Sequence, residues 1–125
     1  MKGKLLRIFG VLASVIGSPR LLFAPPLDFS FDQAAGLSGR VVTPNGDGAN
    51  DAIIFHFYNP MDSAVTLEIF DLAGASVSNL AGLAGDQKLV WDGRDGRGSP
   101  VSAGIYIYQV RAEGKTFSGT IVVAR

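Results

Sequence analysis

Short runs of alternating apolar and polar residues fill the chain from residue 40 onward. Val65, Leu67 and Ile69 alternate with other side chains, so the three aliphatic residues share one face of a strand. β-branched and aromatic residues, which favour strands, are concentrated in these runs. No stretch in this region has the 3.6-residue period of an amphipathic helix. The pattern predicts strands at 53–58, 65–70, 75–80, 87–91, 105–112 and 115–124.

Turn-forming residues separate the predicted strands. Asn59-Pro60 ends the first run, because proline cannot donate to a strand ladder. Residues 71–74 and Glu113-Gly114 supply tight turns, which predicts one β-hairpin over 64–80 and another over 105–124. Six or seven strands at such spacing predict an all-β protein, with an antiparallel β-sandwich of about seven strands over 40–125.

The N-terminal segment has a different pattern. Lys2, Lys4 and Arg7 precede nine apolar residues at 8–16, which is the pattern of a secretory signal peptide. Nine helical residues span about 13 Å, too short to cross about 30 Å of hydrocarbon. We therefore expect a signal peptide over 1–24; the alternative is a folded amphipathic helix. Residues 25–39 are expected to form a linker or a lead-in strand, in which Leu27, Phe29 and Phe31 alternate.

Charge and cysteine content narrow the function classes. The chain has 125 residues, 11 basic and 11 acidic side chains, and no cysteine. Four of the basic residues lie in the first twenty positions, so a processed chain carries seven positive and eleven negative charges. That balance argues against a nucleic-acid partner, which requires clustered lysine and arginine. The absence of cysteine excludes disulfides and thiolate metal sites.

One loop is a candidate cation site. Asn45, Asp47, Asn50 and Asp51 place hard oxygen donors around two glycines, the composition that calcium requires. The spacing is not that of an EF-hand, because Ala49 stands at a ligand position. Asparagine and aspartate side chains that bond to their own backbone would explain the same residues. Calcium is therefore a hypothesis, and no other cofactor is expected.

The sequence also offers candidates for partner binding and for catalysis. Tyr58, Tyr106 and Tyr108 lie on strands that are apolar on both faces, so they either sit in a central strand or form an exposed patch. Strand addition by a partner is predicted along 101–108 and 117–124, with Ile121 in the second segment. His56 is the only histidine, and the carboxylates of Asp92 and Asp95 lie in a glycine-rich turn. We expect no enzymatic activity.

Two segments together resemble a known family. The stretch 91–108 reads WDGRDGRGSPVSAGIYIY, and it follows VTLEIFDLAG at 65–74. This combination is similar to the FlgD-type immunoglobulin-like domain, which pairs such a hairpin with a later W-D-G-x-D block. The resemblance covers about residues 40–125 and implies an immunoglobulin-like sandwich. It also suggests the hook-capping protein of the flagellum, although a general secretory signal fits that role poorly.

The segment TPNGDGAND at 43–51 resembles the opening of type IX or gliding-type C-terminal modules on secreted surface proteins. Many such modules act in secretion sorting or surface attachment. The resemblance implies a secreted or cell-surface module that binds a protein of the envelope or the secretion machinery, with the membrane involved only through the signal segment. The alternatives are a calcium-stabilised carbohydrate- or surface-binding module and a flagellar hook-assembly scaffold. Neither the ligand nor the oligomeric state follows from the sequence.

Overall fold

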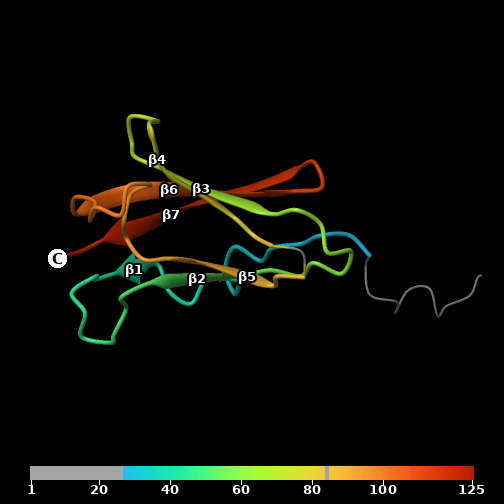
Figure 1. The fold of residues 1–125 in the computed structure, drawn as a ribbon, viewed down its shortest axis with the longest axis horizontal. Coiled ribbons are helices and arrows are strands. Elements are labelled where there is room, and N and C mark those ends of the chain that lie inside the picture. The colour runs from blue at the N-terminus through green and yellow to red at the C-terminus, as the bar shows by residue number, and fades with distance from the viewer. Residues whose placement is uncertain (1–26, 84) are drawn as a thin grey trace, which may run out of the picture.

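The computed structural model describes residues 27–83 and 85–125 (Figure 1). The expected signal peptide at 1–24 lies outside these residues. The described part of the chain contains seven strands and no helix, as the alternating pattern predicted. The strands are β1 (Val41–Val42), β2 (Ile53–His56), β3 (Thr66–Phe70), β4 (Ser76–Ala81), β5 (Lys88–Trp91), β6 (Gly104–Ala112) and β7 (Lys115–Val123).

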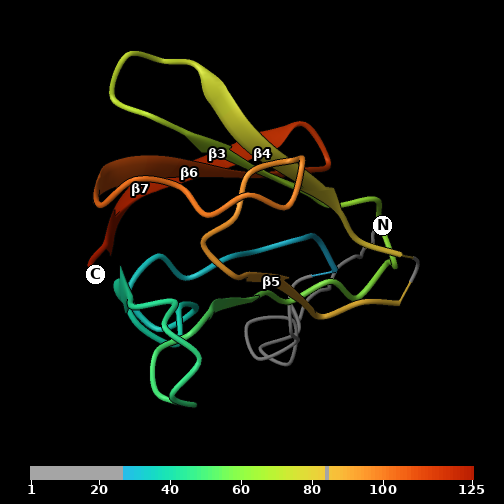
Figure 2. The same ribbon diagram turned by 60° about the vertical axis from the view of Figure 1, so that its left-hand side comes forward.

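The strands form two layers. One sheet has five strands in the order β1-β7-β6-β3-β4, and the other pairs β2 with β5 (Figures 1 and 2). The two predicted hairpins are confirmed as β3–β4 and β6–β7, both antiparallel. The short β1 pairs with β7 in parallel, which the sequence did not indicate. The prediction of an all-β sandwich with about seven strands is confirmed.

Period-two alternation places the core between the layers. Leu67 and Ile69 of β3 are fully buried, and they face Ile53, Phe55 and Trp91 from the smaller sheet. Apolar residues on these inner faces are removed from water, which is the main stabilising contribution to such a fold. Among the described residues, no helix is long and apolar enough to cross a membrane.

The segment 28–42 closes one side of the sandwich. Figure 2 shows it in blue and cyan, running between the two layers. It bonds to the outer edge of β2, where Ser30 bridges Tyr58 and Leu37 bridges Phe55. Its Phe29, Phe31 and Leu37 side chains are buried in the core. Much of the segment expected to be a linker or lead-in strand is therefore a structural part of the domain, and we call residues 28–42 the lead-in segment.

Candidate functional site

The loop after β5 is held by its own side chains. The Trp91 indole Nε1 donates a hydrogen bond to the carbonyl of Arg94, at 2.9 Å. Oδ1 of Asp95 accepts the amide hydrogens of Ser99 and Arg97, each at 2.9 Å. These bonds favour the ionised form and hold the pKa of Asp95 below its ordinary value. The W-D-G-x-D sequence therefore builds a rigid turn on a buried tryptophan.

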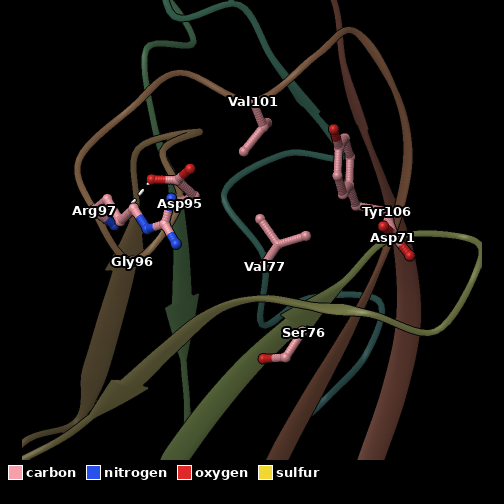
Figure 3. Close-up of a pocket in the computed structure, with 8 residues that line it drawn as sticks. All are labelled: Asp71, Ser76, Val77, Asp95, Gly96, Arg97, Val101 and Tyr106. Atoms are coloured by element: carbon pink, nitrogen blue, oxygen red, sulfur yellow. Dashed lines mark hydrogen bonds between the residues drawn. The ribbon is translucent and has the colours of Figure 1, made fainter.

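A cavity of about 440 Å³ opens beside this loop (Figure 3). Its lining brings Asp71 and Asp95 together with Tyr106 and Val101. Oδ1 of Asp71 accepts hydrogen bonds from the backbone amides of Ala73 and Ala75. Asp71 therefore stabilises the β3–β4 turn in the same way that Asp95 stabilises its loop. The Tyr106 hydroxyl donates to the carbonyl of Ser102 at 2.7 Å. These polar groups stabilise turns, and the Asp71 and Asp95 carboxylates that line the cavity both accept backbone amides.

The four predicted calcium ligands lie in one loop, and the side chains of Asn45, Asp47 and Asp51 accept hydrogen bonds from its backbone amides. The two carboxylate oxygens of Asp51 accept the amides of Gly46 and Gly48, at 3.0 and 2.7 Å. Asn45 Oδ1 accepts the amide of Asp47 at 3.1 Å, and Asp47 Oδ1 that of Ala49 at 2.8 Å. Asn50 has a positive φ of 56°. This geometry favours turn formation over the calcium hypothesis.

The engagement of these carboxylates with backbone amides leads to a first prediction. Across the described residues, no three acidic, histidine or cysteine side chains are placed to hold a metal ion. We expect the melting temperature of the purified chain to be the same in calcium and in chelator. Differential scanning calorimetry with 1 mM calcium or 1 mM EDTA makes the comparison. A rise of several degrees in calcium would restore the calcium-stabilised alternative.

The predicted interaction residues are mostly buried. Tyr106 is 7% exposed, and Tyr108 is fully buried with its ring centroid 5.1 Å from that of Phe55. Of the two alternatives, the central strand is therefore right for these two residues and the exposed aromatic patch is wrong, since both point into the core. Tyr58 alone of the three is on the surface, at 40% exposure. Burial raises the pKa of both buried phenols above the ordinary value.

The predicted strand-addition sites are also corrected. β6 lies between β3 and β7 and pairs with both at 107–111, so Ile107 and Tyr108, at the end of the predicted segment 101–108, have no free backbone edge. Ile121 is fully buried on β7 and lies opposite Tyr106 in the ladder, so it cannot contact a partner. The outer edge of β7 is covered by β1 and by two side chains of the lead-in segment. Gln33 donates to the carbonyl of Ser118, and Arg40 donates to that of Thr120.

A set of polar contacts fixes the start of the lead-in segment, and we call this set the latch. The sequence did not indicate it. The amide of Phe29 donates to Glu113 at 2.9 Å, and the ammonium of Lys115 donates to the Phe29 carbonyl at 3.0 Å. Lys115 also pairs with Asp28 at 2.6 Å, and the Ser63 hydroxyl donates to Glu113 at 2.6 Å. Since the latch partners are 50 to 87 residues apart, no local motif could have revealed them.

The latch predicts an acid-sensitive stability. The Lys115 ammonium lowers the pKa of Asp28, and the Ser63 hydroxyl lowers that of Glu113, with the amide of Phe29 adding to it. A carboxylate with a lowered folded pKa stabilises above its unfolded pKa of about 4, and the contribution is lost as the pH falls through the folded value. We expect a constant melting temperature from pH 7 to about 5 and a decrease below about 4.

A Glu113→Gln variant is the control for this prediction. It keeps the shape of the side chain and removes the titrating group, so its melting temperature should be lower at neutral pH and should fall less on acidification. Melting followed by circular dichroism from pH 3 to 7 gives both curves. If the melting temperature of this variant fell on acidification as much as that of the native chain, Glu113 would not be the group responsible.

The fold and its self-bonded loops define a β-sandwich module, and the comparisons with known proteins identify the family. Residues 37–123 match the CHU_C type IX secretion signal domain. Since the match extends over more than half of the chain, the protein belongs to this family. No curated protein matches the sequence significantly.

A solved structure shares the fold. The chain is similar to PorZ, described as an essential bacterial surface component of the type IX secretion system of Porphyromonas gingivalis. The TM-score is 0.53 with 16% sequence identity over 71% of this chain, but the match spans only 11% of PorZ. At that identity the likeness shows the fold alone. It supports the sandwich architecture independently of the family match.

Proposed function

We propose that the domain is a non-catalytic sorting signal, which the type IX secretion machinery recognises in its folded form. The family match over 37–123 carries this proposal, because it spans all seven strands of the sandwich. A signal read as a folded shape requires a rigid scaffold, and the buried core with its self-bonded loops provides one. The protein is then expected outside the cell or on its surface.

The described residues support a binding role better than a catalytic one. The carboxylates of Asp71, Asp95 and Asp51 all accept backbone amides of their own turns, which leaves them engaged in structure. His56 is exposed on β2 and faces Lys88 across the ladder, not a nucleophile. Recognition would therefore rest on the surface and sheet edges that the sandwich presents to a protein of the secretion machinery.

Fractionation of cells that express the full chain tests this function. We expect the protein in the medium or on the cell surface when the type IX system is intact, and inside the envelope when the translocon gene is deleted. A second secreted protein that uses another route is the control, since its location should not change. Equal export of the chain from both strains would contradict the proposal.

A further inference from the structure

The hydrogen-bond register identifies which sheet edges remain open. In an antiparallel ladder, alternate residues direct both backbone groups to the partner strand, and the intervening residues direct them away. On β2 the outward residues are taken by the lead-in segment: Ser38 donates to Ile54, and His56 donates to Gly36, at 2.9 and 2.7 Å. On the outer edge of β7, β1 pairs with Val122 and Val123, and side chains of the lead-in segment bond to the carbonyls of Ser118 and Thr120. The opposite side, formed by β4 and β5, differs.

β4 has an open outer edge. The amide of Gly82 bonds to the carbonyl of Val65 at 2.9 Å, which sets the parity of the β3–β4 ladder. Asn79 and Ala81 therefore direct their backbone groups away from β3. Both residues are exposed, and among the described residues no backbone group pairs with them on that side. The carbonyl of Val77 is already occupied by the amide of Gly96, so the open edge begins after it.

β5 has an open edge on the same side of the molecule. The amide of Phe57 bonds to the carbonyl of Gln87 at 3.0 Å, so Lys88 and Val90 direct their backbone groups away from β2. A cleft of about 360 Å³ lies between the two strands, lined by Asn79 and Leu80 on one side and Val90 on the other. Its end is formed by the loop at 92–98. Val90, which lines this cleft, is 47% exposed. We call the cleft between β4 and β5 the slot.

We propose that this slot binds an extended segment of a protein of the secretion machinery, which adds as a strand to the open edge of β4 and places an aliphatic side chain against Val90. The proposal rests on the proposed sorting function. Unpaired amides and carbonyls in a row bind another extended backbone, and alternate side chains supply the specificity. The lead-in segment makes the same kind of pairing along β2, within this chain.

The size of the slot favours a single segment over a second copy of this domain. The open edge of β4 extends over about three residues, because the loop at 92–98 covers its beginning. A stable dimer buries about 800 Å² on each partner, far more than three paired residues supply. An extended segment contacts β4, Val90 and the loop at once, so it uses all the walls of the slot. Its short contact suits transient recognition of a protein in transit.

Amide hydrogen exchange on the full chain tests the open edge without a partner. We expect the amides of Asn79, Ala81 and Val90 to exchange at least about 100-fold faster than those of Leu80 and Leu89, which face paired strands. Exchange followed by NMR resolves each residue. Equal protection of the alternate amides would show that the edge is occupied and would overturn the inference.

Export of two variants tests recognition. Asn79→Pro removes an outward amide from the β4 edge, and Val90→Lys places a charge on the wall of the slot. Each should reduce export of the full chain by about tenfold without lowering the melting temperature, through one lost hydrogen bond in the first variant and a desolvated charge in the second. Ser118→Pro is the matched control, because its amide also points outward but lies on the β7 edge, whose carbonyls are occupied.

The outcomes separate the two proposals. If the native chain is exported independently of the type IX system, the sorting function fails. If native export depends on that system but folded Asn79→Pro and Val90→Lys chains are exported normally, only the slot inference fails. A photocrosslinking residue at 79 should capture a component of the secretion machinery, while one at 118 should not. A crosslinked dimer of this chain, or no crosslink at 79 during export, would overturn the inference.

Discussion

Replacing Phe29 with alanine is expected to lower the free energy of unfolding by about 3–5 kcal/mol. The ring is fully buried and packs against Phe57 and Phe117, with centroids 5.4 and 5.9 Å away. The backbone of residue 29 is held by Glu113 and Lys115, so it cannot collapse to fill the cavity. Urea unfolding followed by the fluorescence of the single, buried Trp91 measures the change.

Leu27→Ala is the matched control, because Leu27 lies two residues earlier and is 72% exposed. It should change the free energy of unfolding by less than about 0.5 kcal/mol. If Phe29→Ala proved as mild as Leu27→Ala, the lead-in segment would not belong to the folded domain. The family match begins at residue 37, so this pair of variants tests whether the folding unit begins earlier.

Gly119→Ala is expected to cost about 1–3 kcal/mol, through overpacking. A Cβ atom at this position would lie 2.6 Å from Cε2 and Cζ of Tyr108. The ring cannot retreat, because Phe31 and Phe55 pack against it with centroids 6.0 and 5.1 Å away. Gly119 is therefore required by the close approach of an aromatic ring on the neighbouring strand. Urea unfolding measures the loss.

Two further variants make the Gly119 prediction specific. Gly39→Ala adds the same methyl group where nothing lies within 4 Å, so it should be neutral or stabilise by up to about 1 kcal/mol. Tyr108→Leu combined with Gly119→Ala should cost less than the sum of the two single changes, because the clash is absent. Simple additivity of the two substitutions would show that the ring is not the cause.

The sequence predicted the parts of the fold that depend on local patterns. The alternation of Leu67 and Ile69 placed β3, and Glu113-Gly114 placed the β6–β7 turn, which has φ values of 54° and 74°. The immunoglobulin-like resemblance and the type IX-type opening motif led to the sandwich and to the secretion family. The specific FlgD-type assignment remains a prediction.

The features that the sequence missed depend on contacts far apart in the chain. Tyr106 and Tyr108 lie on a strand with apolar residues on both faces, so alternation could not tell which face is buried. The closure of β2 by the lead-in segment required knowledge of which backbone edges are free. The open edge at Asn79 follows from the register of the β3–β4 ladder. That register depends on the geometry of the hairpin turn, which the sequence pattern did not specify.

The type IX sorting function is tested most directly by export of a reporter protein joined to residues 27–125. The reporter carries its own signal for crossing the inner membrane, and the cells contain either an intact or an inactivated type IX system. We predict export only with the intact system and only when the lead-in segment is present, so that a fusion to 37–125 remains in the cell. Release of both fusions from both strains would contradict a folded sorting signal.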